Sequence, residues 1–391
     1  MSGSLEGLKV LDLSRFIAGP LCAMQLADMG ADVVKVERAG KGEDTRQNKP
    51  QLNDQSLYFL SFNRNKRSLE LDFRSAEGQA QLRQLISKAD VLIENFRPGT
   101  MEKMGCSWET LHQLNPRLIM VRISGFGQQG PLAQRPCFDA IAQAMSGLMS
   151  ITGQPDGPPV MAGTFMVDYA SALYATIGTL AALNARHASG RGQLVEASLL
   201  ESAVSMLISA IPEQAQLGRT MQRAGNLDRF SAPVNSYQAA DQRWVYLSAG
   251  TDTLFARLIE GMARQDLLDD PRFNNYHARL ENNAAIDAVV ANWIRSLPAD
   301  TVVTLMDKVG VPCSLVATID EVLQNPQLKA RNQLVDIDHP TAGTYTTHGV
   351  TVSLSDTPGV IRRAPPVLGA HTDEVLAEWG IDSKGGQHGS H

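Results

Sequence analysis

Asp168 is a residue whose type and position could do chemistry. It stands in the first turn of a long apolar helix predicted to begin at Met166, directly after a Gly- and Pro-rich loop at 153–163. The partial positive charge of a helix N-terminus favours an anion at this position. A carboxylate of ordinary pKa is ionised at neutral pH and can attack an activated acyl group without a general base. An acidic residue that only stabilises its helix would fit the same pattern, so the position alone leaves both interpretations open.

Other residue types that commonly carry catalysis form no recognisable motif. Outside the C-terminal GGQHGSH, the histidines make no HxxH or HExxH pair, and the chain has no GxSxG sequence. The cysteines include no CxxC pair and no neighbouring His at a metal-ligand spacing, so we expect buried thiols and no metal site. The four cysteines are Cys22, Cys106, Cys137 and Cys313.

The turn SRFIAGP at 14–20 follows a predicted strand and precedes a predicted helix. Open α/β sheets bind ligands at this kind of position, and the small Ala18 and Gly19 allow close backbone approach. The turn lacks GxGxxG, which disfavours Glu37 as the ribose-binding acid of a nicotinamide site, whereas the neighbouring Arg38 suggests a phosphate. Other basic residues in the same third of the chain could bind phosphate or lie on a solvated surface: Arg64, Lys66, Arg67, Arg97 and Lys103.

Alternating strand and helix patterns over the first 125 residues predict βαβ units and a parallel sheet. The expected strands begin at Lys9, Asp32, Arg67, Asp90 and Arg117, with helices at 20–29, 76–88 and 107–114. The predicted fold class is α/β, with a doubly wound, Rossmann-like large domain.

Further along the chain, the pattern predicts a strand at 193–198, a helix at 199–211 and a polar crossover at 214–229. A hairpin turning at Asp241 and Gln242, followed by helices, predicts a smaller α+β domain. The expected boundaries are 1–215 for the N-terminal part of the large domain, 216–233 for a crossover linker, 234–310 for the small domain, 311–384 for a linker and return to the large domain, and 385–391 for a tag remnant.

Composition narrows the class of protein. A length of 391 residues suggests two or three domains, and 43% hydrophobic with 19% charged residues is ordinary for a globular protein. We find no secretory signal pattern and no 18-residue apolar run without polar breaks, so we expect a soluble cytoplasmic protein without a membrane partner. A net charge of -6 offers no global basic field for nucleic acid.

Five ordered blocks carry a family resemblance. They are LKVLDLSRFIAGPLCAMQLADMGADVVKVERAGKGEDTR from Leu8, NRNKRSLELD from Asn63, ADVLIENFRPGTMEKMG from Ala89, RPCFDAIAQAMSGLMSITG from Arg135 and APPVLGAHTDEVL from Ala364. Together they resemble the class III CoA-transferases, the CaiB/BaiF or formyl-CoA transferase family, over essentially the full chain. The resemblance implies an inserted smaller α+β domain, placed between the N-terminal and C-terminal parts of the large domain, and an interlocked homodimer of ring-like subunits. It also implies coenzyme A (CoA) as substrate and carrier, with no tightly bound cofactor.

The resemblance also assigns roles to individual residues. It implies that Asp168 is the nucleophile of a double displacement through a mixed anhydride and an aspartyl-CoA thioester. Backbone N–H groups and the helix start would stabilise the oxyanions. The implied acyl-site residues are Ile17, Tyr58, Phe138 and Asp139. The implied CoA contacts are Ala18, Arg38, Leu71, Asn95, Phe96, Arg97 and Lys103.

Two departures from the formyl-CoA transferases bear on the substrates. Their mobile glycine run corresponds here to RAGNLDRFSAP from Arg223, and their Gln corresponds to Ile17. An apolar Ile17 suits a C4–C5 dicarboxylate such as itaconate, mesaconate, citramalate or glutarate, with succinyl-CoA as donor, better than it suits oxalate. One alternative is an α-methylacyl-CoA racemase, but the position of its GHD motif reads Cys137-Phe138-Asp139 here and lacks the histidine of the acid/base pair. A non-catalytic CoA-binding protein is the second alternative.

Overall fold

The computed structural model describes residues 3–381, so the expected tag remnant at 385–391 lies outside the described residues. The chain divides into two compact units. The first comprises Met1–Leu148, Met161–Ser209 and Pro326–His391, and the second comprises Met149–Val160 and Ala210–Asn325. The small domain expected at 234–310 falls within the second unit.

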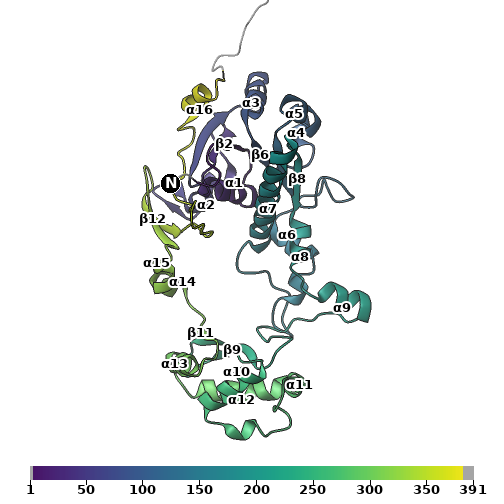
Figure 1. Cartoon of the computed structure of the whole chain (residues 1–391), viewed down its shortest axis with the longest axis vertical. Coiled ribbons are helices and arrows are strands. Elements are labelled where there is room, and N and C mark those ends of the chain that lie inside the picture. Colours follow the sequence, from purple (N-terminus) through teal and green to yellow (C-terminus); the bar gives the residue numbers. More distant parts are fainter. Residues whose placement is uncertain (1–2, 382–391) are drawn as a thin grey trace, which may run out of the picture. The chain divides into compact units, whose positions relative to one another are not determined.

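A parallel sheet of six strands forms the centre of the first unit (Figure 1). Its strands are β1 (Lys9–Asp12), β2 (Asp32–Arg38), β5 (Lys66–Leu71), β6 (Val91–Glu94), β7 (Ile119–Ser124) and β8 (Leu194–Ser198). They lie in the order β5-β2-β1-β6-β7-β8, and every pairing is parallel. The order reverses between β1 and β6, which opens a crevice beyond the carboxyl ends of these two strands. The predicted doubly wound α/β class is confirmed.

Helices cover both faces of this sheet. On one face, α7 (Met166–Ser189) packs against α1 (Ala18–Asp28) and against β7 and β8. The other face carries α3 (Ala76–Lys88), α5 (Trp108–Leu114) and α16 (Thr372–Glu378). Their apolar side chains form one core with alternate strand residues, for example Leu82 with Leu11 and Leu69. Strands that are buried on both faces explain the nearly continuous apolar runs of the sequence.

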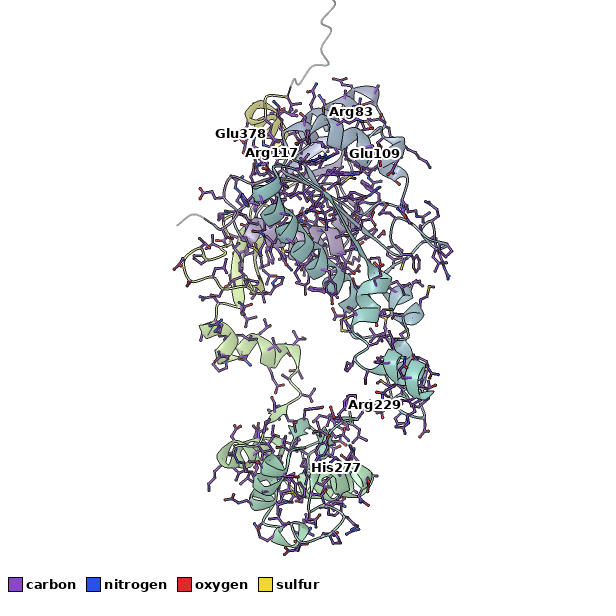
Figure 2. All side chains as sticks on the ribbon, turned by 45° about the vertical axis from the view of Figure 1, so that its right-hand side comes forward. Arg83, Glu109, Arg117, Arg229, His277 and Glu378 are labelled. Atoms are coloured by element: carbon purple, nitrogen blue, oxygen red, sulfur yellow. The ribbon has the colours of Figure 1, made fainter. Side chains whose placement is uncertain are left out.

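Shorter elements complete the first unit. They are η1 (Asp44–Gln47), β3 (Gln51–Leu52), β4 (Gln55–Ser56), α2 (Leu57–Phe62), α4 (Thr100–Lys103), α6 (Asp139–Met145), α8 (Leu199–Ser205), α15 (Pro326–Ala330), β12 (Leu334–His339) and β13 (Gly343–His348). The hairpin β12–β13 packs through Ile337 and Tyr345 against Phe59 and Leu60 of α2. Charged side chains of both signs, including Arg83, Glu109, Arg117 and Glu378, are distributed over this unit (Figure 2).

The second unit contains the antiparallel sheet β11-β10-β9 and a separate apolar core. Its elements are η2 (Met149–Ile151), α9 (Ala210–Leu217), β9 (Val234–Gln238), β10 (Trp244–Ser248), α10 (Asp252–Met262), η3 (Gln265–Leu267), α11 (Tyr276–Glu281), α12 (Asn283–Arg295), α13 (Ala299–Val309), β11 (Cys313–Leu315) and α14 (Ile319–Gln324). The predicted hairpin is present, and Gln242 in its turn has a left-handed φ of 67°.

Three local predictions are wrong in part. The helix expected at 199–211 ends at Ser205, and α9 begins at Ala210 and runs into the stretch that was expected to be a crossover. Ile208 between them has a φ of 49°, which interrupts a helix at the place where the chain passes from the first unit to the second. Cys22 and Cys106 are buried as expected, whereas Cys137 and Cys313 are partly exposed.

Helix α7 is long and apolar enough to cross a membrane by length and composition, and it is the one such helix within residues 3–381. A core helix of a soluble protein meets the same criterion. Here α7 packs against α1, α8 and two strands of the sheet.

Candidate active site

A cavity of about 370 Å³ lies beyond the carboxyl ends of β1, β6 and β7. Four segments and Asp168 contribute most of its wall. The segments are the turn Arg15–Ala18, the stretch Asn95–Pro98 after β6, the stretch Ile123–Gly125 at the end of β7, and Arg135–Phe138 before α6. The cavity therefore occupies the crevice that the strand order predicts.

The turn after β1 is held in place by the segment that follows β6. The side-chain oxygen of Asn95 accepts a hydrogen bond from the Arg15 backbone N–H at 2.8 Å, and its amide group donates to the Arg15 carbonyl at 2.7 Å. Phe16, the next residue, adopts a left-handed φ of 67°, which is costly for a residue with a side chain. Its ring packs edge-on against Phe138 at 5.6 Å, so the strained turn brings two walls of the cavity together.

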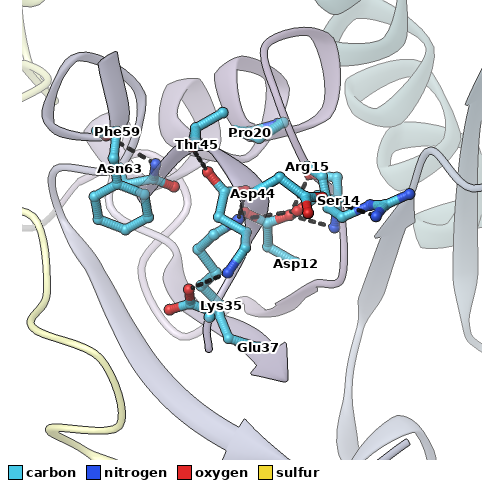
Figure 3. Close-up of polar contacts among 12 residues, drawn as sticks. Asp12, Ser14, Arg15, Pro20, Lys35, Glu37, Asp44, Thr45, Phe59 and Asn63 are labelled. Atoms are coloured by element: carbon cyan, nitrogen blue, oxygen red, sulfur yellow. Dashed lines mark hydrogen bonds and ion pairs between the residues drawn. The ribbon is translucent and has the colours of Figure 1, made fainter. Parts of the chain in front are cut away.

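A buried ion network lies beneath the same turn (Figure 3). Asp12, at the end of β1, pairs with Lys66 at 2.8 Å and lies 3.6 Å from Lys35, which in turn pairs with Glu43 at 2.9 Å. Asp12 also accepts hydrogen bonds from the backbone and hydroxyl of Ser14. Burial alone would raise the pKa of Asp12, but the two lysines outweigh burial and lower this pKa to about 2.

Three of the basic residues that could have bound phosphate or lain on a solvated surface are instead buried in ion pairs. Lys66 is fully buried, and Arg64 and Arg67 form ion pairs with Asp28 and Asp32. These three cations therefore hold the fold together instead of offering charge to a phosphate. Gly19 also has a packing role, because a Cβ atom there would lie 2.2 Å from the Ser14 side chain.

A second cavity, of about 240 Å³, adjoins the first and shares Arg15 and Phe96 with it. Arg38 lines it, and Asp44 pairs with both Arg38 at 2.9 Å and Arg15 at 2.8 Å. The Arg15 guanidinium also lies 5.5 Å from the centre of the Phe96 ring. Two adjoining cavities with a cation and an aromatic ring at their junction suit an elongated ligand that has a polar end and an acyl end.

Asp168 is the acidic residue at the α7 end of the larger cavity. Burial raises its pKa, and the neighbouring Asp139 raises it further, to about 7. Within residues 3–381, no group donates a hydrogen bond to its carboxylate. The assumption of an ordinary pKa is therefore wrong, and Asp168 is partly protonated at neutral pH.

Asp139 lies behind Asp168 and is absent from the cavity wall as described. Its side chain is 1% exposed, and one carboxylate oxygen accepts the backbone N–H groups of Val167 and Asp168 at 2.7 and 2.9 Å. These two N–H groups already donate to Asp139. The expectation that backbone N–H groups at the start of α7 stabilise an oxyanion is therefore wrong for Val167 and Asp168.

The remaining sequence-predicted residues fall into two groups. Ile17, Ala18, Asn95, Phe96, Arg97 and Phe138 line the larger cavity, and Arg38 and Phe96 line the smaller one. Leu71 is buried in the core between the sheet and α3, and Tyr58 and Lys103 line neither cavity. Tyr58 still lies close enough to Asp168 that the carboxylate adds to the effect of burial in raising the pKa of its phenol.

Several cavity residues were not singled out from the sequence. Arg15 and Phe16 belong to the turn whose position was recognised, and Arg135 lies two residues before the CFD sequence, whose Cys137 was considered only as a buried thiol and in the comparison with racemases. Thr100 of α4 and Met104, which directly follows this helix, line the smaller cavity. Arg15 and Arg135 lie inside the recognised blocks, so a search of those blocks for cations would have found them, whereas the exposure of Cys137 depends on tertiary packing.

Comparisons with known proteins agree with this geometry. The model of CoA-transferase family III matches residues 5–372. The chain is 40% identical to a succinyl-CoA–D-citramalate CoA-transferase of Chloroflexus aurantiacus, over 96% of this chain and 93% of that protein. It is 37% identical to a succinyl-CoA:mesaconate CoA-transferase of Haloarcula hispanica, over 97% of both chains.

A solved structure of a CaiB/BaiF family protein from Brucella suis superposes with a TM-score of 0.86 at 33% identity, covering 97% of this chain and 100% of that one. The sequence match and the structural match each extend over nearly the whole chain. The chain therefore belongs to CoA-transferase family III.

Proposed function

We propose that this CoA-transferase moves CoA from succinyl-CoA to a C4–C5 dicarboxylate, such as citramalate, mesaconate, itaconate or glutarate. The observation that carries the proposal is that Asp168 shares its cavity with Arg97 and Arg135, for which no carboxylate partner occurs among the described residues. An unpaired guanidinium in an acyl cavity can bind the distal carboxylate of a dicarboxylate. The names of the Chloroflexus and Haloarcula relatives support the same substrate class.

Asp168 acts as the nucleophile in this proposal. One of its oxygens attacks the thioester carbonyl of succinyl-CoA, the C–S bond breaks, and CoA leaves as a thiolate. The thiolate then attacks the Asp168 carbonyl of the mixed anhydride, releasing succinate and forming an aspartyl-CoA thioester. The acceptor carboxylate attacks this thioester, and the released thiolate attacks the acceptor acyl group to regenerate Asp168. Each step exchanges one anion for another and needs no net proton transfer.

The adjoining cavities suit this sequence, because CoA must remain bound between steps. We assign the smaller cavity, with Arg38 and Thr100, to the nucleotide end and the larger cavity to the acyl end. Ala18, Asn95, Phe96 and Arg97 lie along the larger cavity. Lys103 and Leu71 are candidate CoA contacts from the family resemblance alone.

An acid panel tests the proposal. The enzyme is incubated with succinyl-CoA and one acid at a time, and new acyl-CoA is measured by mass spectrometry. We expect exchange with the C4–C5 dicarboxylates and little with butyrate or oxalate. Exchange with none of the acids would overturn the proposed reaction. Exchange of the α-proton of a 2-methylacyl-CoA in deuterated water would support a racemase instead.

We also propose a homodimer. Apolar side chains of α7 are exposed in the single chain, with Tyr169, Leu173 and Ile177 at 37%, 48% and 61% exposure. A patch of this kind on a soluble enzyme fits a surface that a second copy covers. Light scattering coupled to gel filtration should give twice the chain mass, and a monomer at micromolar concentration would contradict the proposal.

A further inference from the structure

The N-terminus of α7 lacks a cap from its own segment. Its N-cap residue, Phe165, makes no side-chain hydrogen bond to the first turn. Ser, Thr, Asp or Asn usually fills this position, because the first N–H groups of a helix have no partner within the helix. A 24-residue helix that carries the nucleophile in its first turn would otherwise begin with unsatisfied donors.

Asp139 supplies the missing cap from a different element. It is the first residue of α6, and its Oδ2 atom accepts the N–H groups of Val167 and Asp168. Its Oδ1 atom accepts from the Gln143 side-chain amide, whose oxygen accepts the Ala162 N–H at 3.0 Å. The chain from Ala162 through Gln143 and Asp139 to Asp168 therefore ties the loop before α7 to the start of that helix.

We propose that Asp139 is a positioning residue of the transferase: it caps α7 in trans, fixes the backbone of Asp168, and holds a second negative charge beside the nucleophile. This inference rests on the proposed role of Asp168 and deepens it. It differs from the acyl-site role that the family resemblance implied for Asp139.

The charge of Asp139 has a chemical consequence. After burial, it is the second cause of the raised pKa of Asp168. A more basic carboxylate is a stronger nucleophile once ionised, but a smaller fraction of it is ionised below pH 7. Other titratable or charged groups that line the cavity or lie near Asp168 are Arg15, Asp44, Tyr58, Arg97, Arg135, Cys137 and Tyr169. On α8, which packs against α7, Glu201 bonds to Ser198.

Asp139→Asn separates the cap from the charge. Its amide oxygen can still accept the two N–H groups of α7, whereas the negative charge is lost. In the pH profile of kcat/KM for succinyl-CoA, the acid limb is the range in which activity falls as pH is lowered. We expect the midpoint of this acid limb to decrease by about one pH unit. The plateau above pH 8 should fall several-fold, because the less basic Asp168 is a weaker nucleophile. A role in folding alone would lower the plateau and leave the acid limb at its wild-type pH, which would overturn the proposal.

Asp139→Asn with Gln143→Glu is the matched control. In the single variant, the introduced side-chain amide faces the donor amide of Gln143. The carboxylate introduced by Gln143→Glu accepts from that new amide and from the Ala162 N–H, so it restores every hydrogen bond while moving the charge one side chain away. The thermal midpoint should recover towards wild type, with the acid limb still below the wild-type pH. Full return of the limb to the wild-type pH would show that bonding geometry, not the nearby charge, sets it.

A carboxyl titration by ¹³C NMR, with Asp labelled at the side-chain carbon, distinguishes this inference from the transferase proposal. The Asp168 signal is assigned by its loss in Asp168→Asn. It should titrate near pH 7 in the wild type and at lower pH in Asp139→Asn, without any substrate present. An unchanged titration in Asp139→Asn would overturn the positioning role even if transfer activity were demonstrated. A shifted titration in a protein without transfer activity would leave this role intact and reject the proposed function.

Discussion

Asp12 and Asp168 are two carboxylates of the same unit with neighbours of opposite charge. Asp12 is fully buried between Lys35 and Lys66, and its pKa falls to about 2. Asp168 faces the cavity with Asp139 behind it, and its pKa rises to about 7. Burial acts to raise the pKa of both carboxylates, so the opposite shifts follow from the charges of their neighbours. A paired carboxylate stabilises the fold, whereas one held beside a like charge keeps its reactivity for a substrate.

Asp168→Asn tests the reactive member of this comparison and should have the largest effect. Transfer should fall by at least about 10³-fold, because an amide cannot form the anhydride. CoA affinity should remain within about threefold, because the amide keeps the shape of the cavity wall and the CoA contacts are untouched. Exchange rates and isothermal titration calorimetry measure the two properties, and wild-type activity in this variant would reject the nucleophile assignment.

Asp12→Asn tests the structural member. Two buried lysines would lose their shared carboxylate, and the free energy of unfolding should fall by about 3–5 kcal/mol in urea titrations. Adding Lys66→Met removes one of the uncompensated charges, so the double variant should be more stable than Asp12→Asn. A single variant as stable as the wild type would show that the network contributes little.

The pH dependence sharpens the contrast between the two carboxylates. The folded pKa of Asp168 lies above its unfolded value of 3.8, so its ionisation destabilises the folded state as pH rises through this range. Asp168→Asn should therefore be more stable than the wild type at pH 8, by roughly 1–3 kcal/mol, and equal to it below pH 4. The folded pKa of Asp12 is lower than its unfolded value, so its contribution is present above pH 4 and is lost as pH falls towards 2. Urea titrations at pH 8 and pH 4 measure this difference, and equal stabilities at both pH values would contradict it.

Arg135→Leu tests whether this cavity cation binds the substrate carboxylate, since no protein carboxylate among the described residues pairs with it. The KM for a dicarboxylate acceptor should rise by about tenfold or more, while the KM for succinyl-CoA changes less, because that thioester has many further contacts. Arg97→Leu is the matched comparison within the same cavity. Equal KM values for the dicarboxylate in wild type and Arg135→Leu would assign the distal carboxylate to another residue.

Arg38→Met should have the smallest effect. Arg38 is already paired with Asp44, and both side chains are partly exposed, so this cation should contribute modestly to acyl-CoA binding. Its removal should raise the KM for acyl-CoA by about three- to tenfold. The effect should shrink at high salt, because screening weakens the wild-type interaction. A salt-independent loss would indicate a packing role.

The sequence predicted the sheet and the position of Asp168, because hydrophobic periodicity and the Gly- and Pro-rich loop are local signals. It also placed the turn after β1 at a ligand site, since strand order and chain direction determine where such turns lie. The buried pairing of Lys66 with Asp12 joins residues 54 positions apart and has no local pattern. For the same reason, composition could not distinguish Lys66 and Arg67 from phosphate-binding cations.

The cap that Asp139 provides for α7 could not be predicted from the sequence either, because it also joins residues that are distant along the chain. Asp139 and Asp168 are 29 positions apart, and only the packing of α6 against α7 brings them together. The family resemblance assigned roles to both residues but could not show that one acts through the backbone of the other. The raised pKa of Asp168 follows from that packing, so a pattern search assigns it an ordinary value.

Hydroxylamine trapping tests the central claim most directly. The enzyme is mixed with succinyl-CoA and hydroxylamine, digested, and analysed by peptide mass spectrometry. An activated Asp168 should become a hydroxamate only when acyl-CoA is present, while Asp12 remains unmodified in the same sample. A hydroxamate on a different carboxylate, or none in an enzyme that transfers CoA, would contradict the assignment of Asp168 as the covalent carrier.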